Sequence, residues 1–333
     1  MNNFVYSKAH TLSEALEAID KNAGARFIAG GTNILDLMKE NVMKPTELID
    51  INSIGLSDIE RTTMGGVLIG ALATNSDTAY HSLIRSEYPL LSDAILAGAS
   101  PQLRNMATNG GNLLQRTRCY YFYDTAAPCN KRSPGSGCSA ISGFNRIHAI
   151  LGTSEQCIAT HPSDMCVALA ALDAKVHVAG KEGTRLISFP DFHKLPGDTP
   201  HIDNTLSRNE MITGIELPAS AFNIHYKYLK VRDRASYAFA LVSAAVAFEL
   251  KDGTIKDARI ALGGVSHKPW RNRQAEEMLI GQDTANLDLK AAIAHLLEGA
   301  RGFGENDFKI GLARRVIARA CREALRKEAD HAV

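Results

Sequence analysis

The stretch at residues 105–164 constrains this chain most, because a loop of small residues there runs directly into a group of cysteines. The loop has the sequence Ala107-Thr108-Asn109-Gly110-Gly111-Asn112. Its glycines let backbone N–H groups approach an anion, and its hydroxyl and amide side chains suit a pyrophosphate or a ribityl chain. Four of the six cysteines follow it: Cys119, Cys129, Cys138 and Cys157. We therefore expect a cofactor loop joined to a metal site.

The spacing of these cysteines favours an iron–sulfur cluster over zinc. Nine, eight and eighteen residues separate them, whereas structural zinc sites usually take cysteine pairs two to four residues apart. An iron–sulfur cluster needs four thiolates and tolerates irregular spacing. Zinc, free thiols and disulfides stay open on the spacing alone, although clustering without an export signal favours metal ligation over disulfides.

Residues 128–138, between two of these cysteines, are polar, basic and rich in Pro and Gly. They offer no apolar face to bury, so something else must order them, and a thiolate-bound metal would do so. The lysine and the arginine in this stretch would offset the negative charge of a cluster. Cys166 lies further on, in an expected small-residue helix, and we expect it to be a core residue.

A second glycine loop precedes this stretch. Residues 26–29 are predicted to form a short strand that leads into Gly30-Gly31-Thr32-Asn33 and then a helix. Strand, glycine turn and helix is an arrangement that holds phosphate, since the helix N-terminus carries partial positive charge. It is neither a Walker loop nor a Gly-x-Gly-x-x-Gly fingerprint. Alone, it is equally explained as a turn that needs glycine at positive φ.

Length and charge limit the class of protein. With 333 residues the chain is long enough for two domains, and a formal net charge of +1 argues against nucleic-acid binding. The longest apolar runs are too short to span a bilayer, which takes about 20 residues. The first residues lack the pattern of an export signal, so we expect no such signal in the chain itself.

The remaining pattern predicts an α+β protein. In the first part we expect helices at residues 11–19, 90–99 and 165–174 and strands at 47–51, 175–179 and 210–217, with a further strand-like run at 67–75 that ends in small polar residues. Asp164 is interpreted equally well as a ligand-binding residue or as a helix N-cap. After a linker at 219–225, strands at 226–232, 236–248 and 255–262 precede helices at 271–279, 287–297 and 308–327. The arginines of the last helix are expected to form a solvated face.

These motifs, in this order, resemble the FAD-binding subunit of the xanthine oxidase family of molybdenum hydroxylases. The resemblance rests on residues 26–34, 70–71, 100–114 and 161–174, and on residues 226–248 and 261–270 for the subunit's C-terminal domain. The cysteine loop looks like that of the FAD and [4Fe-4S] subunit of bacterial, periplasmic-type aldehyde oxidoreductases. A similar loop occurs in the hydroxybenzoyl-CoA reductase flavoprotein subunit, but residues 230–240 favour the aldehyde oxidoreductase branch.

The resemblance implies a fold, two cofactors and the residues that hold them. The fold would be a two-subdomain FAD-binding domain of the xanthine dehydrogenase and vanillyl-alcohol-oxidase-like type over residues 1–218, with the cysteine loop at 118–158. A smaller α+β domain with an antiparallel sheet and helices would span residues 225–333. The [4Fe-4S] ligands would be the four clustered cysteines. The FAD-binding positions would be Arg26, Phe27, Ile28, Ala29, Gly30, Gly31, Thr32, Asn33, Ile34, Ala107, Thr108, Gly111, Asn112, Asp164 and Lys230.

The resemblance also implies partners. A large subunit with the molybdenum cofactor and a small subunit with two [2Fe-2S] clusters would complete a heterotrimer, and this chain would pass electrons from its FAD to an external acceptor. No catalytic residue is expected in the chain, because the flavin carries the chemistry. Co-export with a partner would make the chain periplasmic; otherwise it is cytoplasmic. The alternatives are a stand-alone FAD-dependent oxidase, a subunit of a hydroxybenzoyl-CoA reductase-like complex, and a zinc-stabilised interaction module.

Overall fold

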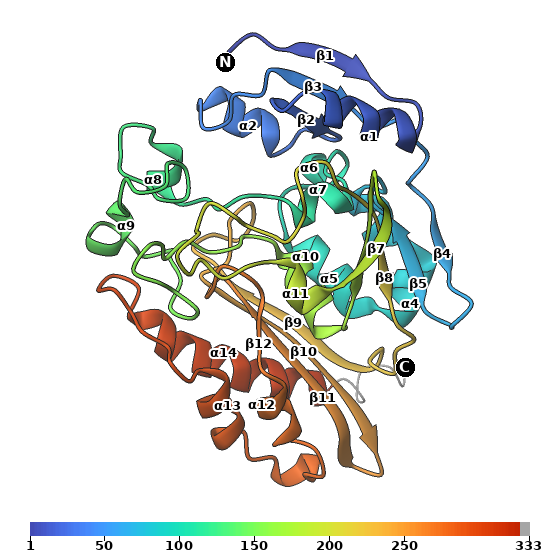
Figure 1. Cartoon of the computed structure of the whole chain (residues 1–333). Coiled ribbons are helices and arrows are strands. Elements are labelled where there is room, and N and C mark those ends of the chain that lie inside the picture. The colour runs from blue at the N-terminus through green and yellow to red at the C-terminus, as the bar shows by residue number, and fades with distance from the viewer. Residues whose placement is uncertain (327–333) are drawn as a thin grey trace.

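The computed structural model describes residues 1–326 (Figure 1). The chain forms three sheets with helices packed around them, so the predicted α+β class is confirmed. The cysteine-rich segment projects to one side, between the N-terminal sheet and the C-terminal helices. Lys327, the predicted end of the last helix, lies outside the described residues. None of the helices within residues 1–326 has the length and apolar character needed to cross a membrane.

The first sheet is small and parallel, with the order β1 (Val5–Lys8), β3 (Glu47–Asp50), β2 (Ala25–Ile28). Helix α1 (Leu12–Lys21) forms as predicted, and the Thr11 side chain accepts a hydrogen bond from the Glu14 backbone N–H as its N-cap. The glycine turn after β2 leads into α2 (Ile34–Lys39). Strand, turn and helix therefore follow one another as the sequence predicts.

The second sheet is antiparallel and carries the helices that surround the second glycine loop. Its order is β4 (Ile59–Arg61), β5 (Val67–Gly70), β8 (Met211–Leu217), β6 (Lys175–Gly180), β7 (Gly183–Ser188). The helices are α3 (Asn75–Tyr80), α4 (Ser82–Glu87), α5 (Pro89–Ala97), α6 (Pro101–Arg104), α7 (Asn109–Leu113), α10 (Asp164–Ala171) and α11 (Phe189–Phe192). The cysteine segment adds only two single turns, α8 (Tyr120–Tyr123) and α9 (Ser139–Ser142).

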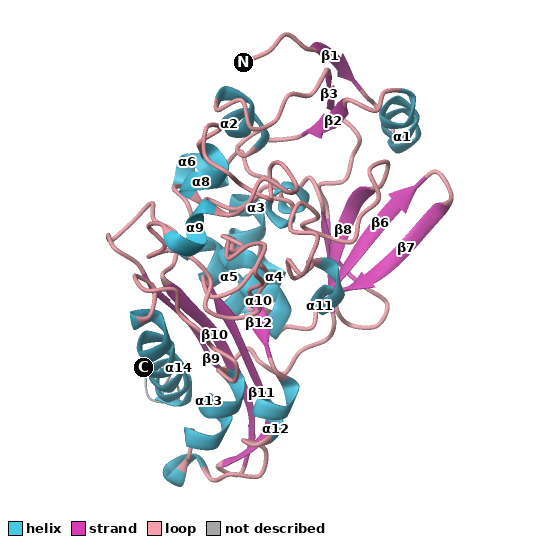
Figure 2. Cartoon of the chain, turned by 60° about the vertical axis from the view of Figure 1, so that its left-hand side comes forward, coloured by secondary structure: helices cyan, strands magenta, loops and turns pink. Residues whose placement is uncertain are grey.

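The C-terminal sheet has the order β12 (Trp270–Arg271), β11 (Thr254–Gly263), β10 (Val242–Lys251), β9 (His225–Val231) and is antiparallel. The helical elements α12 (Arg273–Glu277), η1 (Thr284–Asn286), α13 (Lys290–Leu296) and α14 (Phe308–Leu325) follow it. Figure 2 shows α14 lying along one face of this sheet, with α10 and α5 on the other side. The arginines of α14 are largely exposed, as expected for a solvated face.

Strand β10 is buried on both faces, because consecutive residues point into different cores. Ala245 and Ala247 belong to the core that the second sheet shares with α5 and α10. Ala244, Val246 and Phe248 belong to the core beneath α14. This explains why residues 244–248 are all apolar instead of alternating with polar residues.

One strand begins later than predicted. Residues 236–241 do not extend β10, whose first residue is Val242. The chain turns back sharply there, since Tyr237 adopts a positive φ of 51°, which is incompatible with a strand. Arg118 stacks over the Phe239 ring at 5.2 Å, so part of this turn lies against the cysteine segment.

Candidate functional site

The two glycine loops predicted to bind one cofactor meet in the structure. A Cβ atom at Gly30 would lie 1.7 Å from the backbone oxygen of Met106, so the two loops touch through their backbones at a position that admits only glycine. Gly31 has a positive φ of 72°, and its own Cβ would meet the Leu35 side chain at 2.9 Å. Thr74 and Thr108 pair in an isolated β-bridge behind this junction.

A chain of amides and hydroxyls fixes the second glycine loop. The Asn112 side-chain N–H donates to Asn75 Oδ1 at 2.7 Å. The Ser163 hydroxyl donates to Asn112 Oδ1 at 2.6 Å, which ties the loop to the start of α10. Thr108 is buried, whereas a Cβ at Gly111 would meet only the Thr108 hydroxyl, at 3.1 Å. The loop backbone is thus rigid, and space remains beside Gly111.

Asp164 is not the N-cap of its helix. Ser163 takes that role, since its hydroxyl accepts from the Cys166 backbone N–H at 3.1 Å. The Asp164 carboxylate instead accepts from the Tyr228 hydroxyl at 2.6 Å and the Lys230 ammonium at 2.8 Å. The N-cap interpretation is therefore wrong. Burial and the neighbouring carboxylate raise the pKa of Tyr228, which keeps its hydroxyl a donor.

Two predicted FAD-binding residues near the first glycine loop, Asn33 and Arg26, differ in whether the protein already satisfies their side chains. The Asn33 Nδ2 group is buried and has no hydrogen-bond partner within the described structure, while its Oδ1 accepts from the Arg116 backbone N–H at 2.9 Å. Unpaired buried donors are costly, so Asn33 suits a bound acceptor such as a phosphate oxygen. Arg26 lies on β2, and its guanidinium donates to the Ala25 carbonyl at 2.6 Å. The Arg26 guanidinium therefore contacts the backbone of its own strand.

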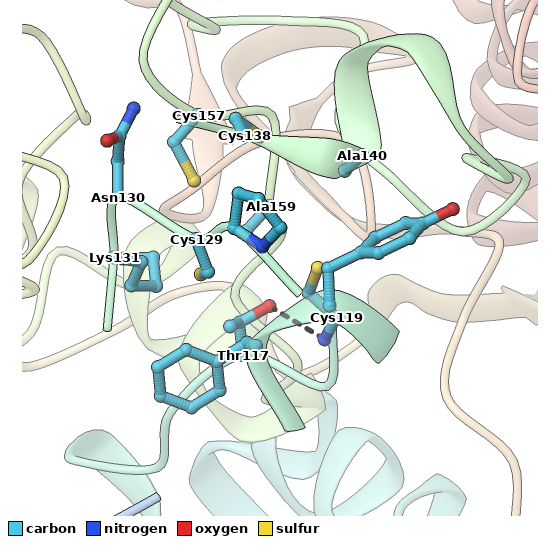
Figure 3. Close-up of a pocket in the computed structure, with 12 residues that line it drawn as sticks. Thr117, Cys119, Cys129, Asn130, Lys131, Cys138, Ala140, Cys157 and Ala159 are labelled. Atoms are coloured by element: carbon cyan, nitrogen blue, oxygen red, sulfur yellow. Dashed lines mark hydrogen bonds between the residues drawn. The ribbon is translucent and has the colours of Figure 1, made fainter. Parts of the chain in front are cut away.

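The four predicted cysteines lie around one pocket. Cys119, Cys129, Cys138 and Cys157 all line it, together with Thr117, Tyr121, Phe122, Pro128, Asn130, Lys131, Ala140 and Ala159 (Figure 3). Three of these cysteines are buried and Cys138 is half-buried. Burial raises the pKa of the Cys119 thiol to about 12, and a hydrogen bond from Cys157 lowers the pKa of Cys138 to about 6.

The clustered cysteines do not form a compact three-ligand group in the described structure. Within residues 1–326, the one group of three ligand side chains whose ligand atoms lie within 4.8 Å of one another is His161, Cys166 and His193. Tetrahedral zinc with Zn–S bonds of about 2.3 Å would place its sulfurs roughly 3.8 Å apart. A four-iron cluster carries its thiolates on the corners of a larger cube.

Buried cations order the polar part of the cysteine loop. The Lys131 ammonium pairs with Asp203 and donates to the Pro200 carbonyl at 2.7 Å. Arg132 donates to the carbonyls of Tyr121 and Ala127, among others. Protein acceptors therefore hold both side chains in the described structure. That a bound metal orders the loop and that these cations offset its charge stay predictions.

Two buried residues beside this pocket were not singled out from the sequence. The His148 Nε2 atom lies 3.0 Å from Cys119 Sγ. Lys309, at the start of α14, is fully buried and donates to the carbonyls of His148 and Gly264 at 2.7 and 2.5 Å. Burial lowers the pKa of Lys309 to about 7 and that of His148 to about 4. A buried lysine without a carboxylate partner has no periodic signal in sequence, so the pattern gave no reason to choose it.

Cys166 is a core residue, as predicted, but it has two histidine neighbours. The His161 and His193 rings lie 4.3 Å apart between centroids, and His193 Nε2 donates to the Leu113 carbonyl at 2.9 Å. Burial lowers the pKa of both histidines, so both rings are neutral. Phe192 and Phe189 pack edge-on against His193 at 4.8 and 5.7 Å. This group forms part of the packing beneath α10.

Comparison with known proteins identifies the family. Residues 2–220 match the family described as the FAD binding domain in molybdopterin dehydrogenase, and residues 225–324 match the CO dehydrogenase flavoprotein C-terminal domain. The chain belongs to the FAD-binding medium subunits of the xanthine oxidase family of molybdenum hydroxylases. It is thus an FAD-binding oxidoreductase subunit, and the predicted family and fold are confirmed.

Individual relatives place the chain within that family. It is 52% identical to the aldehyde oxidoreductase FAD-binding subunit PaoB of Escherichia coli, over 97% of this chain and 99% of the relative. It is 31% identical to the glyceraldehyde dehydrogenase medium chain of Sulfolobus acidocaldarius, over 87% and 85%. The solved carbon monoxide dehydrogenase of Hydrogenophaga pseudoflava superimposes with a TM-score of 0.74 at 24% identity, covering 98% of both chains, which shows a shared fold.

Proposed function

We propose that this chain is the electron-transfer flavoprotein subunit of a molybdenum-containing aldehyde oxidoreductase, and that it holds a [4Fe-4S] cluster as well as FAD. It takes electrons from a small [2Fe-2S] subunit onto FAD and passes them to an external acceptor. A large subunit with the molybdenum cofactor oxidises the aldehyde. Identity of 52% over nearly the full length to a subunit named for this activity supports the aldehyde assignment.

The observation that carries the cluster proposal is the single pocket lined by all four clustered cysteines. Cys119 and Cys129 are each 6% exposed and Cys157 is 4% exposed, so water is largely excluded from three of the four sulfurs. Solvent exclusion and the number of thiolates are properties that iron–sulfur clusters use to set their potentials. Cys119, Cys129, Cys138 and Cys157 would each supply one thiolate.

For FAD, the contact between Gly30 and Met106 and the unpaired Asn33 amide support a pyrophosphate site between the two glycine loops. The proposed binding segments are residues 26–34 and the second loop at Ala107, Thr108, Gly111 and Asn112. Asp164 and Lys230 would lie on the ribityl and ring side, because Ser163 links them to Asn112. When bound, FAD accepts electrons in pairs or singly, which suits a junction between clusters and an acceptor.

The limits of the two domains are also proposed. We assign the FAD-binding domain to residues 1–218 with the cysteine loop at 118–158, and the C-terminal domain to residues 225–333, of which 327–333 lie outside the described part. Residues 219–224 between them have no helix or strand.

The test is to purify the complex with wild-type chain and with Cys129→Ser, and to measure FAD, iron and acid-labile sulfide per complex. We expect Cys129→Ser to lose about four iron atoms and four sulfides while FAD is retained. Cys321→Ala is the matched control, since Cys321 is a fully buried cysteine in the core beneath α14. A wild-type complex that contains zinc and no additional iron, or one whose chain is colourless, would overturn the assignment.

A further inference from the structure

His148 lies behind a proposed cluster ligand and not inside the pocket. Its Nε2 atom is 3.0 Å from Cys119 Sγ, yet His148 is absent from the residues that line the pocket. The side chain is 1% exposed, so no water competes for this contact. The ring therefore contacts the sulfur without lining the pocket.

The C-terminal domain fixes the position of this ring. Lys309 Nζ donates to the His148 carbonyl at 2.7 Å, and Asn306 Nδ2 donates to the Ala149 carbonyl at 3.0 Å. The His148 backbone N–H donates to the Asn145 carbonyl at 2.9 Å. The ring also lies 6.4 Å from the Tyr121 ring, between centroids. These contacts hold the histidine where Nε2 meets the sulfur.

The chemistry of the pair decides which atom donates. A metal-bound thiolate has no proton and can only accept a hydrogen bond. The imidazole Nε2 atom is within hydrogen-bond distance of the sulfur, and its Nδ1 atom has no partner within the described residues. With the proton on Nε2, the ring donates to the sulfur, and the unpaired Nδ1 atom is only an acceptor. With the proton on Nδ1, a buried N–H donor would be left unpaired, which costs more.

We propose that His148 donates an Nε2–H···Sγ hydrogen bond to Cys119 and thereby raises the reduction potential of the cluster. The inference rests on the proposed function, because it requires the cluster. A donor beside the sulfur stabilises negative charge, and the reduced cluster carries more of it than the oxidised cluster. His148 is thus a positioning and tuning residue for the electron pathway and not a ligand.

The experiment compares His148→Gln and His148→Leu in the purified complex. Glutamine keeps an N–H donor, whereas leucine fills part of the same space without one. His177→Leu is the control, because His177 lies on β6 and its ring contacts Glu216 at 2.8 Å, away from the cysteines. The readouts are iron and sulfide per FAD and an EPR-monitored redox titration of the cluster and of FAD.

We expect His148→Leu to have a more negative cluster potential than wild type, His148→Gln to fall between them, and the FAD potential to stay unchanged. Loss of iron in the leucine variant alone would support the same role, since it shows that the donor is needed to retain the cluster. Equal potentials, or equal iron loss, in both variants would overturn the inference while leaving the cluster assignment intact. A wild-type complex without cluster iron would overturn both.

Discussion

The two candidate cofactor sites are built in opposite ways. The FAD site is formed by backbone: the glycine turn before α2 and the segment that leads into α7 touch where a Cβ at Gly30 would lie 1.7 Å from the Met106 oxygen. The cysteine pocket is formed by side chains on a segment with only two single helical turns. Its order depends on an ion pair with a residue far away in the sequence, since the buried Lys131 pairs with the half-buried Asp203.

This difference predicts which kind of substitution would disrupt each site. A backbone site fails when an atom is added, because no rotamer change relieves a clash with a carbonyl oxygen. A site held by buried ion pairs fails when a partner is removed, because the other charge is left without compensation. The following substitutions separate the two cases, starting with the largest expected effect.

Gly30→Ala should abolish the FAD site. The added methyl would meet the Met106 carbonyl far inside contact distance, so the loops must separate at a cost of about 3 kcal/mol or more. Flavin content after purification measures the effect, and we expect FAD per chain to fall by at least about tenfold, since 1.4 kcal/mol corresponds to a factor of ten.

The control is Gly311→Ala in α14, where a Cβ would meet only the Arg315 side chain, at 3.6 Å. Alanine is favoured over glycine within a helix by roughly 0.5–1 kcal/mol, so this variant should keep its FAD and gain slightly in stability. Full flavin occupancy in Gly30→Ala would contradict the description of the site as a backbone contact.

Lys131→Met should disturb the cysteine pocket and spare the flavin loops. The substitution leaves Asp203 paired only with Arg116, at 2.7 Å. Removing one partner of a buried pair costs about 3–5 kcal/mol, and because Asp203 is partly exposed we expect roughly 2 kcal/mol. Urea unfolding measures it. Lys181→Met removes an exposed partner of Asp20 and should change stability by less than about 1 kcal/mol. Equal effects in both would show that burial of Lys131 is unimportant.

The contribution of Asp203 should fade in acid. Burial raises the pKa of its carboxyl, but Lys131 and Arg116 outweigh this and hold the pKa at about 2. A group whose folded-state pKa is depressed stabilises the protein above its unfolded pKa and loses that contribution as pH falls towards the folded value. The stability difference between wild type and Asp203→Asn should therefore shrink by roughly 1 kcal/mol between pH 5 and pH 3. A constant difference over that range would assign the effect to hydrogen bonding instead of charge.

The same contrast explains what sequence reasoning could reach. The first glycine turn, the Thr11 cap and the longer strands β8, β9 and β11 depend on local rules, so the pattern located them. Strands β4, β7 and β12 were not predicted. The grouping of four cysteines was predictable from their number and proximity in sequence. The sequence offered two interpretations of Asp164, as a ligand-binding residue or as an N-cap, and could not choose between them. Its partners Tyr228 and Lys230 are more than sixty residues away. Lys309 and His148 carry no pattern and needed the structure.

The double burial of β10 has a consequence for how the molecule holds together. Neighbouring residues of that strand complete two different cores, so neither core can open without exposing one face of the shared sheet. If the backbone were cleaved between residues 220 and 225 and the two fragments separated, each fragment would expose the apolar surface that the other one covers. We expect one cooperative thermal transition for the described chain, and a midpoint that rises for the whole chain when either cofactor binds.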